Sequence, residues 1–288
     1  MVKITGQVIQ LIRQALKEDI GSGDITTSLI VDSGCRAKAV IVAKSSGILC
    51  GLAVCQEAFR QFDKGFRFKF WHEEGKKIRR GEKIAEIEGK AAAILAAERT
   101  ALNFLQHLSG IATLTSSFVN KVKSTGVQIC DTRKTTPGWR YLEKYAVRTG
   151  GGKNHRLGLY DQILIKENHI KIAGSISKAI YRAKIKNKRK LLLEVETKNL
   201  REIREALLAG TDWIMLDNFS PPQIKPAIRL IRQFSRRTKK KITIEVSGNV
   251  NLRNVRGLAQ TGPDLISVGQ LTHSAPALDF SLKILKCW

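Results

Sequence analysis

The stretch LLLEVETKNLREIREALLAGTDWIMLD, residues 191–217, decides the fold of the second half of this chain. Its ends, LLLEVE and WIMLD, are short apolar runs typical of buried strands, and the amphipathic segment between them is typical of a helix. A strand, a crossover helix and a second strand predict two parallel strands, because the helix returns the chain to the end of the sheet where the first strand began.

Equivalent apolar runs recur from residue 127 to residue 269. The strand candidates are VQICD, QILIK, LLLEVE, WIMLD, ITIEVS and DLISVG, and their spacing leaves room for a crossover helix and two turns. This series predicts a parallel α/β sheet. Because six strands are fewer than the eight of an ordinary barrel, a barrel with fewer strands and a doubly wound open sheet both remain possible.

Chemically active or flexible residues stand at the end of each strand candidate. They are Asp131, Arg133, Lys166, Glu196, Asp217, Ser247, Gly248 and Gly269. Parallel strands in a barrel deliver their carboxyl ends to one shared face. We therefore expect these residues to converge on a single site, although they are spread over most of the second half of the chain.

The first half of the chain has a different pattern. Residues 7–19 place apolar side chains at helical spacing, and a glycine-rich turn with a cap-like Asp24 follows. The segments at 36–51 and 66–89 alternate apolar and polar residues between glycine turns, which predicts a largely antiparallel sheet. Residues 91–122 predict a long helix, broken near Gly110, that separates two domains.

Composition limits the classes of protein that the chain can belong to. An apolar content of 43% supports a packed core, and 50 basic residues against 25 acidic ones give a net charge of +25, which favours anionic partners. Much of the excess lies in two runs, at 182–190 and 229–241. We interpret these runs as solvated faces rather than a nucleic-acid footprint, because neither carries a known docking motif.

Cysteine usage and hydropathy indicate the compartment. The five cysteines include no CxxC pair, so neither a disulfide framework nor a thiolate zinc site is predicted. The sequence also lacks an export signal and an uninterrupted apolar stretch long enough to cross a bilayer. We therefore expect a cytoplasmic protein.

Cations and glycines concentrate in one window, residues 131–169. Basic residues of the window include Arg133, Lys134, Arg140, Arg148, Lys153, His155, Arg156 and Lys166. Guanidinium forks bind carboxylate or phosphate oxygens in pairs, and the triplet Gly150, Gly151 and Gly152 lets the backbone approach a ligand closely. The window predicts an enzyme site for a small, multiply charged anion.

The order and spacing of several motifs resemble one enzyme family, the quinolinate phosphoribosyltransferases. The motifs are EDIGSGDITT, ERTALNFLQHLSGIATLT, DTRKTTPGWRYLEKYAVRTGGGKNHRLGLYDQILIKENHI, LLLEVET, WIMLDNFSP, IEVSGNV and SVGQLTHSAPALDFSLKI. The resemblance implies an N-terminal α+β sandwich domain at 1–108 and an incomplete, seven-stranded, TIM-like α/β barrel at 109–272. It also implies a C-terminal helix at 273–288 that returns to the sandwich domain.

The resemblance further implies a reaction and its partners. The phosphoribosyl group of phosphoribosyl pyrophosphate would pass to quinolinate with loss of pyrophosphate and carbon dioxide, giving nicotinate mononucleotide in NAD biosynthesis. The implied cofactor is Mg²⁺, and the implied assembly is a homodimer in which Arg99 reaches the partner's site.

Residue roles carry over onto matching positions. For quinolinate the family pattern implies Arg133, Lys134, His155, Arg156 and Lys166, with Arg99 from the partner. A lone loop histidine is commonly a simple hydrogen-bonding residue, however, and without this context Arg99 would be interpreted as an ion-pair partner of Glu98.

On the phosphoribosyl side, Glu196 and Asp217 are implied to bind ribose hydroxyls and Mg²⁺, with Glu194 a weaker candidate. The implied 5-phosphate residues are Ser247, Gly248, Asn249, Gly269 and His273. We expect Lys134, Lys166, Glu196 and Asp217 to act in catalysis.

Two other functions remain open at this point. A paralogue of the same fold, of the type associated with molybdenum transport, would use another acceptor, although the dicarboxylate set is complete here. A basic nucleic-acid-binding protein would use the runs at 182–190 and 229–241 and would bind in a salt-sensitive manner.

Overall fold

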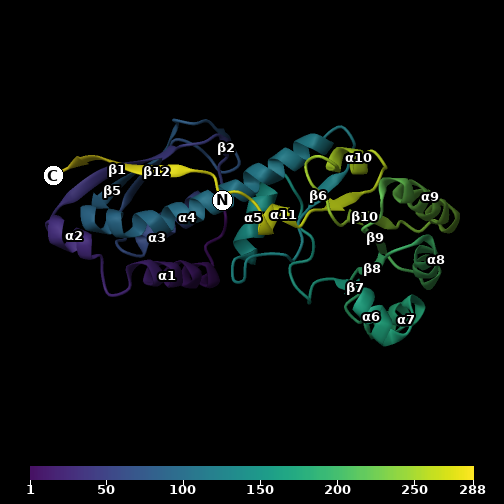
Figure 1. Cartoon of the computed structure of the whole chain (residues 1–288). Coiled ribbons are helices and arrows are strands. Elements are labelled where there is room, and N and C mark those ends of the chain that lie inside the picture. The colour runs from purple at the N-terminus through teal and green to yellow at the C-terminus, as the bar shows by residue number, and fades with distance from the viewer. The chain divides into compact units, whose positions relative to one another are not determined.

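The computed structural model describes every residue from Met1 to Trp288. The chain forms two compact units (Figure 1). The first unit consists of Met1–Ser116, Thr136–Gly151 and Ser274–Trp288, and the second of Ser117–Thr135 and Gly152–His273. The segment at 136–151, which the predicted boundaries assign to the barrel, therefore groups with the first unit.

The first unit is built on the predicted antiparallel sheet. Its strand order is β12-β1-β5-β3, and β2 and β4 form a separate pair. The strands are β1 (Arg36–Ala43), β2 (Gly47–Ile48), β3 (Arg67–Phe70), β4 (Lys77–Ile78), β5 (Lys83–Lys90) and β12 (Phe280–Cys287). The helices are α1 (Gly6–Ile20), α2 (Ile25–Ile30), α3 (Leu52–Arg60), α5 (Arg140–Thr149) and the greater part of α4 (Ala91–Val122). Asp24 caps α2 as predicted, since its carboxylate accepts the Thr27 N–H at 2.9 Å.

The prediction of a C-terminal helix at 273–288 is wrong. The short helix α11 (Gln270–His273) ends at His273, and the chain continues as strand β12, which pairs antiparallel with β1 from Ala43↔Phe280 to Ala37↔Cys287. Residues 280–284, FSLKI, alternate apolar and polar side chains, which is the period of a strand. Backbone pairing with β1 also satisfies N–H and C=O groups that would otherwise stand at a sheet edge.

Helix α4 is not broken at Gly110. It runs without interruption for 32 residues, and Gly110 is buried in it. A Cβ at this position would lie 2.1 Å from the carbonyl oxygen of Pro276, so glycine serves the close approach of another segment of the first unit. No helix of the protein, α4 included, is long and apolar enough to cross a membrane.

The second unit contains a six-stranded parallel sheet with the order β6-β11-β10-β9-β8-β7. The strands are β6 (Gln128–Cys130), β7 (Ile163–Ile165), β8 (Leu193–Thr197), β9 (Trp213–Asp217), β10 (Thr243–Ser247) and β11 (Leu265–Ser267). The helices are α6 (Glu167–Ala173), α7 (Ile176–Lys186), α8 (Leu200–Ala209), α9 (Pro221–Thr238), α10 (Val255–Ala259) and α11. Because β7 to β11 are neighbours in chain order, the sheet has the sequence of an open barrel and not that of a doubly wound sheet.

The seventh strand implied by the resemblance is reduced to a single bridge. Lys153 pairs in parallel with Cys130 on the free edge of β6, and the pairing stops there. The next N–H groups bond to side chains instead: that of His155 donates to Asp131 Oδ1 at 2.9 Å, and that of Arg156 donates to His155 Nδ1 at 2.8 Å. Strand pairing therefore ends where the chain turns at His155 and Arg156.

Strand alternation separates the core of the second unit from its site. Val195, Ile214, Leu216, Ile244 and Val246 are at most 1% exposed and form the apolar face of the sheet. Residues of the alternate positions, among them Glu196, Met215, Asp217, Glu245 and Ser247, line a cavity. The period of two therefore turns every second strand residue toward the functional face.

Candidate functional site

A cavity of about 910 Å³ lies within the second unit, at the carboxyl ends of its strands. All of the predicted site residues except Arg99 line it. They are Arg133, Lys134, His155, Arg156, Lys166, Glu196, Asp217, Ser247, Gly248, Asn249, Gly269 and His273. Arg99 lies on α4 in the first unit and has an exposed side chain. The convergence expected of parallel strand ends is thus confirmed for the second unit.

Two strand-end carboxylates face this cavity. Glu196 of β8 lies 3.3 Å from the ammonium group of Lys166, measured from Oε2 to Nζ. Asp217 ends the next strand, β9, and accepts a hydrogen bond from the side chain of Asn218 at 3.0 Å. Carboxylate oxygens are hard ligands, so Glu196 and Asp217 offer the donor type that Mg²⁺ prefers.

A tight loop follows β10. Gly248 has a φ of 100° and Asn249 a φ of 51°, so both residues are in the left-handed region. A Cβ on Gly248 would lie 2.1 Å from Asn218 Oδ1 and 3.0 Å from the Asn218 backbone nitrogen. Only glycine fits here without displacement, and the loop brings backbone groups close to the cavity.

Two cations of the cavity, Arg133 and Arg156, lie close enough to repel each other. Arg156 is only 8% exposed, and its Nη1 donates to the carbonyl oxygen of Gln162 at 3.3 Å. Burial lowers the pKa of Arg156, repulsion from Arg133 lowers it further, and the carboxylates of Glu194 and Asp161 raise it. The Nε of Arg133 is buried and makes no hydrogen bond within the protein. An anionic ligand would relieve this repulsion and supply the missing acceptor.

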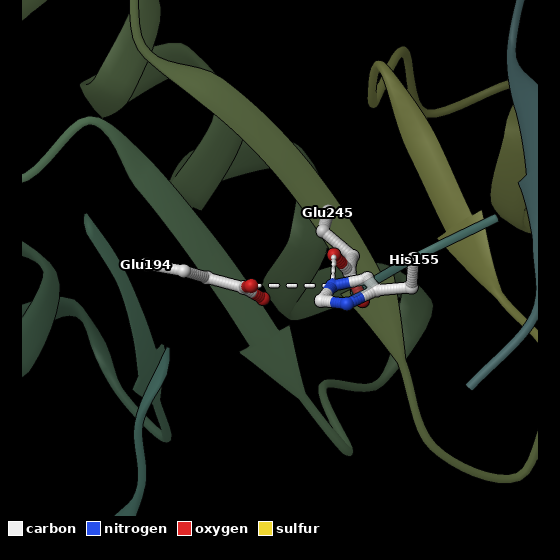
Figure 2. A group of neighbouring side chains, drawn as sticks. All are labelled: His155, Glu194 and Glu245. Carbon is white, nitrogen blue, oxygen red and sulfur yellow. Dashed lines mark hydrogen bonds and ion pairs between the residues drawn. The ribbon is translucent and has the colours of Figure 1, made fainter. Parts of the chain in front are cut away.

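Beneath the strand-end residues lies a buried cluster of His155, Glu194 and Glu245 (Figure 2). His155 Nε2 is 3.1 Å from Glu194 Oε2 and 3.2 Å from Glu245 Oε2. Both glutamates are fully buried, and the His155 side chain is 6% exposed. The His155 ring also lies 5.2 Å from the ring of Trp213, centroid to centroid.

Sequence reasoning gave Glu194 only a weak role and missed Glu245 altogether. A signal for both was present: each is an acid in the middle of an apolar strand, two residues before a predicted site residue, Glu196 or Ser247. Residues two apart on a strand point to the same side of the sheet. Both glutamates therefore face the interior of the barrel, one layer below the strand ends.

The hydrogen bonds of His155 determine its protonation. Burial lowers the pKa of the ring, whereas the hydrogen bonds to Glu194 and Glu245 outweigh burial and raise it. The Arg156 N–H faces Nδ1 at 2.8 Å, so the ring proton that faces the two carboxylates is carried by Nε2. Burial, followed by repulsion from Glu245, raises the pKa of Glu194 to about 7, so Glu194 tends to retain a proton.

The same hydrogen bonds decide whether the cluster suits a metal ion. Its three ligand atoms lie within 4.8 Å of one another, which is close enough for one cation. A histidine that binds a metal through Nε2 normally carries its proton on Nδ1. Here Nδ1 accepts a hydrogen bond, so Nε2 is a donor and not a ligand. The cluster is a hydrogen-bonded network.

A cavity lined by cations and carboxylates at the carboxyl ends of an open parallel barrel is typical of an α/β-barrel enzyme for a small, charged substrate. Residues 24–109 match the N-terminal domain, and residues 111–283 the C-terminal domain, of quinolinate phosphoribosyl transferase. The chain belongs to the quinolinate phosphoribosyl transferase family.

Individual relatives agree with this assignment. A protein of Bacillus subtilis named probable nicotinate-nucleotide pyrophosphorylase (carboxylating) is 43% identical over 279 residues, which cover 96% of this chain and 93% of the relative. A protein of the same name from Methanocaldococcus jannaschii is 44% identical, with 96% and 97% covered. The solved nicotinate-nucleotide pyrophosphorylase of Francisella tularensis has a TM-score of 0.91 at 41% identity and covers 99% of this chain and 98% of its own.

Proposed function

We propose that this protein transfers the phosphoribosyl group of phosphoribosyl pyrophosphate to quinolinate. Pyrophosphate and carbon dioxide are released, and the product is nicotinate mononucleotide, an intermediate of NAD biosynthesis. The activity is that of a nicotinate-nucleotide diphosphorylase (carboxylating), a pentosyltransferase. The observation that carries the proposal is the set of cations, Arg133, Lys134, Arg156 and Lys166, that lines one cavity together with two strand-end carboxylates.

The cations supply the quinolinate end of the site. Quinolinate carries two adjacent carboxylates; two guanidinium groups and two ammonium groups are opposite to them in charge, and the guanidinium groups can bind their oxygens in pairs. Arg156 is nearly buried and repelled by Arg133, which supports a role in binding an anion rather than in solvation.

The carboxylates supply the phosphoribosyl end. Glu196 and Asp217 would hold Mg²⁺ and accept ribose hydroxyls, and the loop of Ser247, Gly248 and Asn249 would receive the 5-phosphate, with Gly269 and His273 beside it. Bound Mg²⁺ would neutralise charge on the departing pyrophosphate. The fit rests on donor chemistry: both side chains offer oxygen, and both face the cavity.

The reaction needs positioning and charge compensation more than a covalent nucleophile. Cleavage of the bond between C1 and pyrophosphate develops positive charge on the ribose, and the pyridine nitrogen attacks C1. The ring nitrogen then carries positive charge, so the electron pair left by the departing CO₂ is stabilised on the adjacent carbon, which takes up a proton. Lys134 and Lys166 would stabilise the anionic groups during these steps.

The acceptor test is direct. Purified protein is mixed with phosphoribosyl pyrophosphate, Mg²⁺ and quinolinate, and nicotinate mononucleotide is measured by chromatography. Omission of quinolinate and removal of Mg²⁺ by a chelator are the controls. We expect product only in the complete mixture. Absence of product from folded protein would overturn the proposal and favour a paralogous enzyme with another acceptor.

We also propose a homodimer in which Arg99 enters the partner's quinolinate site, in a cytoplasmic enzyme whose five cysteines are free thiols. The exposed position of Arg99 on α4 supports this role. Mixing inactive Arg99→Ala and Lys134→Ala chains tests the assembly. A mixed dimer would contain one doubly altered site and one intact site, so up to about half of the sites should recover. Differently tagged chains verify exchange, and mixed dimers that stay inactive would refute the shared site.

A further inference from the structure

Both ring nitrogens of His155 are already engaged within the protein. Nε2 faces the carboxylates of Glu194 and Glu245, at 3.1 and 3.2 Å, and Nδ1 accepts the backbone N–H of Arg156 at 2.8 Å. Figure 2 shows the imidazole enclosed between the two carboxylates, which come from different strands. Both ring nitrogens are therefore directed at groups of the protein, although the ring borders the cavity.

The same cluster holds Arg156 from two directions. Its backbone N–H is bound to His155, as described, and its guanidinium Nη1 donates to the carbonyl oxygen of Gln162 at 3.3 Å. The Gln162 side chain donates in turn to Glu194 Oε2 at 2.8 Å, the oxygen that also faces His155. Glu194 Oε2 therefore contacts both His155, which precedes Arg156 in the chain, and Gln162, whose carbonyl oxygen accepts from the Arg156 guanidinium group.

Charge provides a second reason for the cluster. Arg156 and Arg133 repel each other, and the attraction of Glu194 opposes that repulsion. Glu194 and Glu245 are completely buried, and each has one oxygen, Oε1, without a hydrogen bond. Packing alone does not explain two buried acids, because burying apolar side chains of similar size at these positions would cost less free energy than burying carboxyl groups.

We propose that Glu194 and Glu245 are positioning residues of the quinolinate site. They hold His155 below the cavity, and His155 in turn fixes Arg156 so that its guanidinium meets a substrate carboxylate. His155 acts on bound quinolinate through Arg156. This inference rests on the proposed function, which assigns Arg156 to quinolinate.

The first test separates the two substrates kinetically. Glu245→Gln and Glu194→Gln keep the size of the side chain and replace its carboxyl group with an amide. We expect each to raise the KM for quinolinate by about tenfold to a hundredfold, the cost of a lost charge-assisted hydrogen bond, with the KM for phosphoribosyl pyrophosphate within about twofold of wild type. A merely structural role would raise both KM values or lower the amount of active enzyme alone, and that outcome would overturn the proposal.

The chain offers a matched control. Glu74→Gln makes the same change in the first unit, where the Glu74 carboxylate accepts the N–H groups of Gly51 and Leu52 at 3.0 and 2.7 Å and borders no part of the cavity. We expect this variant to leave both KM values within about twofold of wild type.

A double variant tests whether the glutamate acts through Arg156. Arg156→Lys removes the paired guanidinium contact. If Glu245 only positions that contact, Glu245→Gln combined with Arg156→Lys should raise the quinolinate KM no further than Arg156→Lys alone. Effects that multiply would show that Glu245 acts independently of Arg156 and would refute the proposal.

Nitrogen NMR of the wild-type protein, with ¹⁵N-labelled histidine, examines His155 without any variant. The ring is assigned through its contacts with Trp213. We expect a protonated Nε2 and an unprotonated Nδ1, both unchanged when quinolinate saturates the protein. A change of either nitrogen on quinolinate binding would assign His155 to the ligand and overturn the inference. If wild-type protein failed to make nicotinate mononucleotide, the proposed function would fail instead, and the NMR result would still report the tautomer.

Discussion

Replacing Gly248 with alanine should separate the phosphate end of the site from the quinolinate end. Gly248 has a φ of 100°, a conformation that alanine adopts at a cost of about 1–3 kcal/mol. The new Cβ would also lie 2.1 Å from Asn218 Oδ1 and 3.0 Å from the Asn218 backbone nitrogen, so a side-chain shift alone does not make room. The loop must either keep its shape under strain or move.

These two responses have different consequences. If the loop keeps its shape, the folded protein loses about 1–3 kcal/mol of stability; if it moves, the affinity for phosphoribosyl pyrophosphate falls by about fivefold to 150-fold. We expect the two losses together to amount to about 1–3 kcal/mol, with the KM for quinolinate nearly unchanged. Urea unfolding and the KM for each substrate measure the three quantities.

Gly257→Ala is the matched control. Gly257 lies in α10, has no left-handed φ, and an added Cβ would meet open space. Alanine should therefore leave both KM values unchanged and stabilise the protein by up to about 1 kcal/mol. Gly248→Ala protein with wild-type stability and wild-type affinity for phosphoribosyl pyrophosphate would refute the account of this loop.

Three further predictions concern specificity, metal use and pH. Nicotinate should be used about a hundredfold less efficiently than quinolinate or worse, because one carboxylate leaves buried cations unpaired; comparable kcat/KM values would contradict the dicarboxylate site. Glu196→Ala and Asp217→Ala should chiefly impair phosphoribosyl pyrophosphate and Mg²⁺ use while quinolinate binding, measured by calorimetry, persists; a variant with normal magnesium dependence would remove that residue from the phosphoribosyl side. The pKa of Glu194 is raised from 4.5 to about 7 in the folded protein. Between these values the folded state binds more protons than the unfolded state, so the contribution of Glu194 to the free energy of unfolding should fall as pH rises from about 5 to about 7. Glu194→Gln should flatten this part of the pH dependence in urea unfolding, and an unchanged slope would show that Glu194 titrates normally.

Much of the site could be predicted because it depends on local periods and one topological rule. The apolar runs identified all six parallel strands. Because the carboxyl ends of such strands share one face, the sequence also predicted that the residues at those ends meet in one cavity; they are Lys166, Glu196, Asp217, Ser247 and Gly269. These inferences need no knowledge of which strands are neighbours, because every carboxyl end of a parallel barrel faces the same way.

Features that depend on distant partners were predicted less well. The family resemblance implied a helix where strand β12 lies, and the strand that pairs with this segment, β1, lies more than two hundred residues away in the sequence. Likewise, a glycine within a helical segment predicts a break at Gly110. In the structure this glycine instead allows the backbone of Pro276 to pack closely, and the sequence does not show that Pro276 lies beside it.

His155 marks the boundary between the two kinds of information. The sequence by itself determined the parallel sheet, the functional face and the types of side chain on it, because strand periodicity and charge are local properties. Only the tertiary structure decided that the Nε2 of His155 lies between Glu194 of β8 and Glu245 of β10, while its Nδ1 is taken by Arg156. A hydrogen bond is set by distances of a few tenths of an ångström between segments far apart in the chain, and that geometry exists only once the strands have paired.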